Sequence, residues 1–361
     1  MTRILLIAEM GPFGGTRTYF EMLTDLLLRQ GYVVDALLTV SDGDKEFHAF
    51  TRQRKTLRWK KLPSANGIFR LPPLRQFWEA VFFSFTLIRY RPKLVVVSTG
   101  TPTHWLTQFL FPVPGLQILH TVIQKPGWRL RRLLPFLLYR LSHKRRLVTV
   151  SKHAAQQVVL HWERNIAYIH NPTPFPEVVN NPKTAHAGRV ITVGHVVDYK
   201  NPYLWLDVAR RVIALRPGTS FIWHGDGPLF EEMRLQAQGE PNIEFAGRAY
   251  DMTAVYAEAG IYFQPSLLES HGLAVIEAMS HGLPCVVSDR GGMSESVVHG
   301  ETGYLEKADD VASFVEKIIS LLDNKDIAAS FGKNAQQRVK EHFMPEQWEK
   351  RMLALIDEIT A

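Results

Sequence analysis

With 361 residues, 46% of them hydrophobic and 21% charged, the chain is typical of a soluble globular protein and too long for one ordinary core, so we expect two domains. Its most apolar stretches, 80–88 and 133–139, are shorter than the roughly 20 apolar residues of a membrane-spanning helix, which excludes that reading of them. The charge is uneven: residues 1–180 contain 25 Lys and Arg and 10 Asp and Glu, whereas the remaining residues contain 17 Lys and Arg and 25 Asp and Glu. We therefore expect the first half to bind an anionic partner or surface.

The first half alternates apolar strands with helices. Residues 3–8 (RILLIA) form a short apolar run that ends in a Gly-rich loop, which predicts a buried parallel strand. A helical pattern follows over 18–30. Further strands are predicted at 32–40, 93–99, 116–122 and 146–151. Strands that alternate with helices indicate a parallel, doubly wound sheet.

The same alternation starts again near residue 189. Its strands are predicted at 189–196, 221–227, 243–248, 261–266 and 284–289. The preceding segment, 171–189, has four prolines and little periodicity, so we interpret it as a linker. We therefore expect an α/β protein of two Rossmann-like domains, 1–175 and 176–345. Ligands bind beyond the carboxyl ends of such strands, so a cleft between the domains is expected to hold the site.

Two loops between a predicted strand and a predicted helix are suited to phosphate. In GPFGG (11–15) the glycines permit close approach of the backbone, and the helix that follows presents free N–H groups. A tight structural turn explains this loop equally well. Lys200 lies just before Pro202, which suits a first helical turn, so its ammonium is placed to meet a diphosphate. The alternative is an ordinary surface lysine.

Two carboxylates eight positions apart, Glu269 and Glu277, flank an apolar segment that predicts the start of a helix. In a continuous helix they would lie about 12 Å apart along the axis, comparable to the reach of a sugar nucleotide. The helix N-terminus, near Gly272 and Leu273, would then lie between the acids, where its N–H groups can bind a diphosphate. Two ordinary structural carboxylates are the alternative.

These residues resemble a known family. ESHGLAVIE (269–277) fits the E-x7-E motif of retaining glycosyltransferases of the GT-B fold, glycosyltransferase family 4, and residues 241–305 resemble the family's signature block. RVITVGHVVDYKNP (189–202) resembles a second family segment. GPFGGTRTY, LQILHTV, VTVSKHA and YIHNP resemble its N-terminal landmarks. The resemblance spans nearly the whole chain and implies a GT-B architecture whose last helix, here 346–361, returns to the N-terminal domain.

The resemblance implies roles for the residues around the two acids. Glu277 is expected to bind the donor ribose, and Glu269, a catalytic residue in this reading, to contact donor-sugar hydroxyls. Gly272 and Leu273 are expected to offer backbone N–H groups to the diphosphate, and Lys200 to bind the same phosphates.

The remaining implied site residues lie elsewhere in the sequence. Gly14 and Gly15 match the glycine pair near the donor phosphate and the acceptor. His120 matches a histidine beside the donor sugar and is expected to be catalytic. Ala249 matches the position whose backbone contacts the nucleotide base.

The sequence departs from the family pattern at two places. His195 stands where arginine is usual, giving H-x4-K instead of R-x4-K, and histidine is only partly protonated at neutral pH. We therefore expect activity to fall as pH rises through the His195 pKa, unless Arg248 or Arg17 compensates. Ser270 and His271 replace the usual Gly-Phe, a change expected to bear on donor-sugar selectivity.

We predict a metal-independent enzyme without a cofactor. No persuasive Asp-x-Asp strand-end motif is present, and the aspartates of 41–46 resemble a polar loop. A helix N-terminus with nearby cations can stabilise a diphosphate leaving group without metal. The two acids are too widely spaced for the covalent route of retaining glycosidases, whose carboxylates lie roughly 5 Å apart. The resemblance implies same-face attack, with the acceptor proton passing to the leaving phosphate.

The expected partners are a nucleotide-sugar donor, with UDP favoured over GDP, and a glycan or lipid-linked acceptor of cell-envelope polysaccharide or lipopolysaccharide synthesis. Basic segments 52–61 and 125–146 carry Trp and Leu among their Arg and Lys. The second is typical of an amphipathic segment suited to an anionic membrane surface, and a solvated face over an ordinary core is the alternative. Nucleic acid is not expected, because no recognised motif accompanies the charge.

We expect a cytoplasmic protein, peripheral on the inner face of the cell membrane. No signal peptide is visible, and the single cysteine, Cys285, forms no internal disulfide. Two alternatives remain: a sugar-nucleotide epimerase of the same architecture, which needs no acceptor, and a non-catalytic membrane-associated partner protein.

Overall fold

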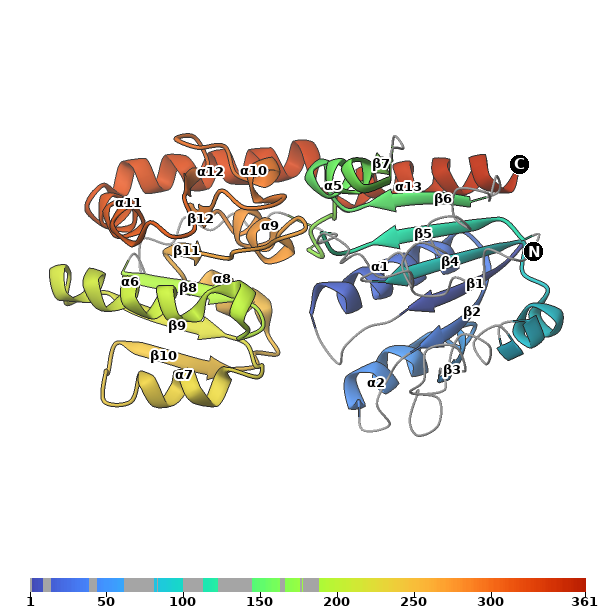
Figure 1. Cartoon of the computed structure of the whole chain (residues 1–361), viewed down its shortest axis with the longest axis horizontal. Helices are drawn as coiled ribbons and strands as arrows, with labels where there is room; N and C mark the ends of the chain where they lie inside the picture. The colour runs from blue at the N-terminus through green and yellow to red at the C-terminus, as the bar shows by residue number, and fades with distance from the viewer. Residues whose placement is uncertain are drawn as a thin grey trace. The chain divides into compact units, whose positions relative to one another are not determined.

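The computed structural model (Figure 1) describes residues 2–8, 14–38, 44–61, 81–82, 84–99, 113–122, 145–162, 166–175, 177 and 188–361. The chain divides into two compact units. The N-terminal unit holds Met1–Ile169 and Glu349–Ala361, and the C-terminal unit holds His170–Trp348.

The described part of the N-terminal unit contains a parallel sheet with the strand order β3-β2-β1-β4-β5-β6-β7. Its strands are β1 (Arg3–Ala8), β2 (Val33–Leu38), β3 (Arg58–Lys61), β4 (Leu94–Thr99), β5 (Gly115–Leu119), β6 (Arg145–Thr149) and β7 (Ala167–Tyr168). Its helices include α1 (Gly15–Arg29), α2 (Lys45–Gln53) and α5 (Lys152–Trp162). β1 lies between β2 and β4, so the winding of the sheet reverses beside β1.

The C-terminal unit repeats this plan with the strand order β10-β9-β8-β11-β12-β13, again parallel. The strands are β8 (Arg189–Val193), β9 (Ser220–His224), β10 (Ile243–Gly247), β11 (Ile261–Gln264), β12 (Cys285–Ser288) and β13 (Gly303–Glu306). The helices are α6 (Pro202–Leu215), α7 (Phe230–Gln236), α8 (Met252–Ala257), α9 (Leu273–Ser280), α10 (Met293–Ser296), α11 (Val311–Asp323) and α12 (Lys325–His342). The predicted two doubly wound α/β units are confirmed.

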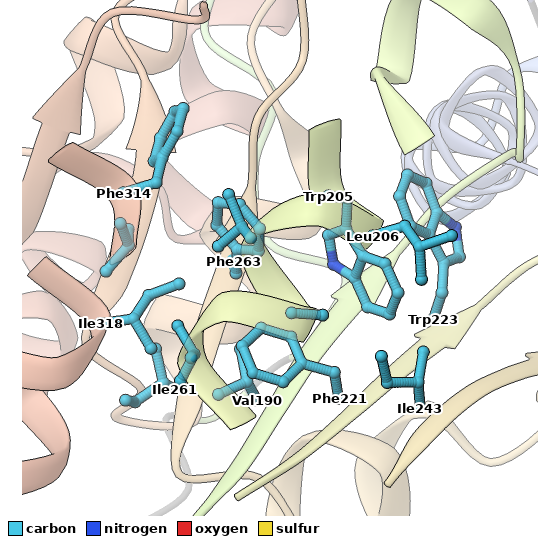
Figure 2. Close-up of a cluster of buried hydrophobic side chains, with 14 of the residues drawn as sticks. Val190, Trp205, Leu206, Phe221, Trp223, Ile243, Ile261, Phe263, Phe314 and Ile318 are labelled. Atoms are coloured by element: carbon cyan, nitrogen blue, oxygen red, sulfur yellow. The ribbon is translucent and has the colours of Figure 1, made fainter. Parts of the chain in front are cut away.

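A dense aromatic cluster fixes α6 against the sheet of the C-terminal unit (Figure 2). Trp205 is fully buried and meets Trp223 edge-to-face, with ring centroids 5.3 Å apart. The Trp205 indole N–H donates to the Thr192 hydroxyl at 2.6 Å, so its polar group is satisfied in the core. Thr192 lies near the end of β8, so this packing anchors α6 next to the loop that follows that strand.

The division between the units falls at 169/170, not at the predicted 175/176, because the first part of the expected linker is bound to the C-terminal unit. The Thr173 N–H donates to the Phe343 carbonyl at 2.8 Å. The Asn171 N–H donates to the His271 ring at 3.2 Å. Residues 176 and 178–187 of the expected linker lie outside the described residues.

The last helix, α13 (Pro345–Thr360), begins in the C-terminal unit and belongs to the N-terminal unit from Glu349 onward. Glu349 accepts a hydrogen bond from Arg29 of α1 at 2.5 Å, and Glu358 pairs with Arg146 of β6 at 3.2 Å. The second crossing of the chain between units therefore falls within this helix, at 348/349, three residues after the predicted boundary.

Candidate donor site

The C-terminal unit gathers most of the predicted site residues where the winding of its sheet reverses. β8 and β11 are neighbours, although three helices and two strands separate them in the sequence. The loop after β8 carries Lys200, and the loop after β11 carries Glu269. In doubly wound sheets such a switch point is where ligands bind.

The loop after β8 is held by close backbone contacts. The Trp223 indole N–H donates to the Gly194 carbonyl at 2.9 Å. Gly225, after β9, lies so near that a Cβ on it would come within 1.8 Å of the same carbonyl oxygen. A side chain at Gly225 would thus require the two loops to separate.

Lys200 ends the short 3₁₀ turn η5 (Asp198–Lys200), directly before α6. Asn201 takes the left-handed conformation, with φ at 59°, and Pro202 opens the helix. The Lys200 ammonium folds back over Gly194, where it lies 3.5 Å from the place that a Cβ on Gly194 would take. The turn therefore directs the ammonium toward the end of β8.

Glu269 is the partner of this lysine. Its carboxylate accepts a hydrogen bond from the Lys200 ammonium, and the side chains of Lys200 and Glu269 are only 13% and 12% exposed. Gln264 donates to the same carboxylate oxygen at 2.6 Å, and the Ser266 hydroxyl at 3.4 Å. Three donors thus fix the orientation of an acid that is shielded from water.

Two glycines hold the backbone of Glu269 in place. A Cβ on Gly291, where φ is +67°, would come within 1.8 Å of the Glu269 carbonyl oxygen. The Gly292 N–H donates to that oxygen at 3.1 Å. We did not single out Gln264, Gly291 or Gly292 from the sequence. The adjacent glycines after β12, and the polar residue at the end of β11, are the signals that could have identified them.

α9 begins at Leu273, which agrees with the helix start that we predicted near Gly272 and Leu273. Glu269 lies in the loop before the helix, and the estimate of 12 Å for a continuous helix does not apply. Gly272 is the N-cap, and its φ of +80° breaks the helical path toward Glu269. The expected order is nevertheless confirmed, because the helix N-terminus lies between Glu269 and Glu277 along the chain.

Among the described side chains, none caps the N-terminus of α9. The first N–H groups of a helix have no partner within the helix, and they carry the positive end of its dipole. Together with the Lys200 ammonium, they provide the kind of positive environment that binds phosphate oxygens.

Glu277 lies in α9 and is half-buried. Its carboxylate accepts a hydrogen bond from the Tyr256 hydroxyl at 2.7 Å. Burial raises the pKa of Glu277 to about 7, although the bond from Tyr256 opposes this rise. A carboxyl group that titrates near neutrality can either accept hydrogen bonds from hydroxyl groups or donate one.

His195 and Ala249 also follow strands of this unit. His195 is half-buried, next to Gly194 after β8. Ala249 is half-buried after β10, between two exposed residues. One of these is Arg248, whose guanidinium lies 5.9 Å from the ring centre of Tyr250, a side chain that is 79% exposed. Both predicted residues are thus on loops at the carboxyl ends of strands.

Gly14, Gly15 and His120 all lie in the N-terminal unit. Gly14 has φ at 104° and is the N-cap of α1, which Gly15 opens. The ring of Tyr19, in α1, packs edge-on against the His120 ring, with ring centroids 4.6 Å apart. The His120 ring nitrogen also lies 2.8 Å from the Ser98 hydroxyl, at the end of β4. Burial lowers the pKa of His120 to about 4, so the ring is neutral at physiological pH.

The structure shows what Arg17 and His271 contact. Arg17 is buried and pairs with Glu21 at 2.9 Å and Asp44 at 2.8 Å, so these acids already bind the guanidinium that we considered as a phosphate ligand. Asp44, one of the aspartates of segment 41–46, also caps α2. Residues 41–43 lie outside the described residues.

His271, expected to affect donor-sugar selectivity, is 1% exposed and stacks on His170 with ring centres 4.7 Å apart. Its Nδ1 accepts the Asn171 N–H. Burial, followed by the nearby His170, lowers the pKa of His271 well below its ordinary value. These contacts make it a neutral, buried link between the loop of the two acids and the start of the C-terminal unit.

Two family models match the chain. Residues 179–338 match the model described as glycosyl transferases group 1, and residues 13–174 match the model described as glycosyltransferase family 4. Together the matches leave little of the chain unassigned.

Curated relatives are similar over part of their length. A UDP-Gal:alpha-D-GlcNAc-diphosphoundecaprenol alpha-1,3-galactosyltransferase of Escherichia coli is 29% identical over 157 residues, which cover 42% of this chain and 40% of the relative. A trehalose synthase of Thermococcus litoralis is 38% identical over 172 residues, covering 44% of this chain and 41% of the relative. The chain thus spans less than half the length of these relatives.

Solved structures match over nearly the whole chain. S. aureus TarM, crystallised with UDP, alpha-GlcNAc-glycerol and fondaparinux, has a TM-score of 0.80 at 13% identity and covers 98% of this chain and 99% of its own. Anabaena HepE in complex with UDP-glucose has a TM-score of 0.80 at 16% identity, covering 99% of this chain and 100% of its own. At such identities the likeness establishes the fold, which is GT-B. The chain therefore belongs to the group 1 glycosyltransferases, of the family 4 type with a GT-B fold.

Proposed function

We propose that the protein transfers a hexose from a nucleotide-sugar, UDP-linked in preference to GDP-linked, to a glycan or lipid-linked acceptor. We further propose that the transfer retains the anomeric configuration, needs no metal, and serves the synthesis of cell-envelope polysaccharide or lipopolysaccharide.

One arrangement carries this proposal: the partly buried Lys200–Glu269 pair beside the uncapped N-terminus of α9, with Glu277 farther along that helix. When the bond to the sugar breaks, negative charge develops on the diphosphate. An ammonium and a helix N-terminus that are already in place stabilise this charge without rearrangement. Glu269 is then available to sugar hydroxyls and Glu277 to the ribose. Among the described residues, no group of three or more His, Cys, Asp or Glu side chains could hold a metal ion.

The names of similar proteins support the choice of donor and acceptor. The E. coli relative is named for UDP-Gal and for a diphosphoundecaprenol acceptor, and the similar structures of TarM and HepE contain UDP and UDP-glucose respectively. A lipid-linked acceptor agrees with the excess of basic residues in the first half of the chain. We therefore propose a peripheral position on the anionic inner face of the cell membrane. Among the described residues, no helix is both long and apolar enough to span a bilayer.

Incubation of the purified protein with a panel of UDP- and GDP-hexoses tests the proposal. Each donor is offered alone and with lipid-diphosphate-linked GlcNAc, with and without EDTA, and the products are followed by NMR. We expect acceptor-dependent release of UDP, a product with the anomeric configuration of the donor, and rates that EDTA leaves unchanged. Conversion of donor in the absence of acceptor to an epimeric sugar nucleotide would instead indicate an epimerase. Inverted product or loss of activity in EDTA would refute the corresponding part of the proposal.

A further inference from the structure

A helix of the N-terminal unit carries apolar side chains on two opposite faces. Residues 81–82 and 84–90 are helical and precede β4. On the inner face, Leu87 is buried with strand residues of β1, β2 and β4, and Phe82 packs against the same cluster. Thr86, 3% exposed, donates its hydroxyl to the Phe82 carbonyl at 2.8 Å. This inner face accounts for the attachment of the helix to its sheet.

The outer face is apolar as well. Val81, Phe85 and Ile88 are 43%, 64% and 71% exposed. At about 100° per residue, positions i, i+4 and i+7 fall within an arc of about 60° on a helix, so the three side chains form one stripe. Scattered exposed apolar residues are ordinary, whereas a stripe of this kind marks an interaction surface. We call these three residues the outer stripe.

The charge around the outer stripe indicates what it contacts. Arg89 lies beside the stripe on the same helix, Arg91 and Lys93 follow directly, and all three are exposed. The sequence has no Asp or Glu from residue 80 to residue 99. Apolar side chains flanked by exposed cations suit the boundary between the headgroups and acyl chains of an anionic membrane. A symmetric contact between two copies would instead bring these cations against each other.

We propose that the outer stripe inserts into the surface of an anionic membrane, with Arg89, Arg91 and Lys93 binding lipid phosphates. This inference rests on the membrane association proposed above, and it identifies the surface of the protein that contacts the membrane. It is independent of basic segment 125–146, of which residues 125–144 lie outside the described residues.

Flotation of the full-length protein with lipid vesicles tests the inference. One set of vesicles is pure phosphatidylcholine, and the other contains one part phosphatidylglycerol to two parts phosphatidylcholine. We expect the protein to float with the anionic vesicles. Phe85→Ser with Ile88→Ser should weaken that partition about 10-fold to 100-fold, because two exposed apolar side chains no longer leave water. Arg89→Gln with Lys93→Gln should weaken it about 10-fold, and only on anionic vesicles.

The C-terminal unit offers a matched control. Leu215 and Leu235 are 56% and 58% exposed, so Leu215→Ser with Leu235→Ser removes comparable apolar surface elsewhere and should leave flotation unchanged. Unchanged flotation of the Phe85→Ser, Ile88→Ser variant would overturn the inference, as would a dimer in solution that this variant abolishes. Donor turnover with a soluble acceptor analogue is measured in parallel. It should be the same in all variants, so a failure of membrane binding is distinguishable from a failure of sugar transfer.

A fluorescence experiment, in which membrane binding increases the signal, distinguishes loss of binding from misfolding of a variant. Cys285, the only cysteine in the chain, is fully buried, so a thiol-reactive NBD dye should label Phe85→Cys selectively at residue 85. Anionic vesicles should raise and blue-shift the NBD emission at this position and leave a label on Leu235→Cys unchanged. Equal responses at the two positions would also overturn the inference.

Discussion

Glu277 should make the stability of the unliganded protein depend on pH. Burial raises its pKa from the ordinary value of 4.5 to about 7, so the folded state binds the proton more tightly than the unfolded state does. Stability is therefore lost as pH rises from about 4.5 to about 7, and the loss is complete above the folded pKa. At about 1.4 kcal/mol per pKa unit, the full loss amounts to about 3 kcal/mol.

Glu277→Gln removes this titration while an amide oxygen still accepts the Tyr256 hydrogen bond. We expect the variant and the parent to have similar free energies of unfolding near pH 4. The variant should become more stable by about 3 kcal/mol near pH 8. Urea unfolding followed by tryptophan fluorescence across this range gives the difference between the two proteins, in which the titrations of all other groups cancel.

A difference that stays flat from pH 4 to pH 8, or a variant that is less stable at pH 8, would refute the reasoning. Affinity for UDP, measured by calorimetry on the same samples, should move the other way and fall in the variant, because a neutral amide is a weaker acceptor than the carboxylate that we propose binds the ribose hydroxyls. A variant that gains stability and keeps its affinity would leave the burial argument intact and contradict the assignment of Glu277 to the ribose.

Three further predictions concern the loops of the donor site. Lys200→Met keeps most of the length of the side chain but removes the cation, so it should lower kcat/KM in steady-state kinetics about 100-fold or more. A decrease of less than 3-fold, or about 0.6 kcal/mol, would contradict a contact between Lys200 and phosphate. Gly291→Ala places a Cβ against the Glu269 carbonyl and should lower both Tm and turnover; Gly300→Ala is the matched control, since Gly300 also has a positive φ, of +78°, but has nothing within 4 Å of an added Cβ. In the parent protein we expect activity to fall as pH rises past the pKa of the His195 imidazole, and His195→Arg should abolish that fall. If the pH–rate profiles of the variant and the parent coincide, a contact between His195 and phosphate is excluded.

The sequence predicts the central strands well, because buried parallel strands appear as short apolar runs whose signal is local. It misses β3, β7 and β13, which lie at the edges of the two sheets. The motif around Glu269 and Glu277 identifies the loop and the helix that carry them. It also locates the start of the helix near Gly272, where the structure has a left-handed N-cap. The sequence does not show whether an arginine is free or already paired with an acid: Arg17 meets Asp44, which lies 27 residues away in the sequence.

The role of His271 was hidden for the same reason. Its contacts, His170 and Asn171, lie about 100 residues earlier in the chain, so only the tertiary structure brings the three together. The glycines that support the loop of Glu269 are similar. Their importance comes from a backbone approach between the ends of β11 and β12 that no periodicity in the sequence records.

The contacts of Gly225 with Gly194 and of Gly291 with Glu269 divide the site into positions that can and cannot vary. Its floor is assembled main chain against main chain, so any side chain introduced there collides with a neighbouring loop. Arg248 and Tyr250, by contrast, are exposed side chains. A directed-evolution library aimed at accepting new activated sugars would do best to leave the glycines untouched and randomise these exposed positions.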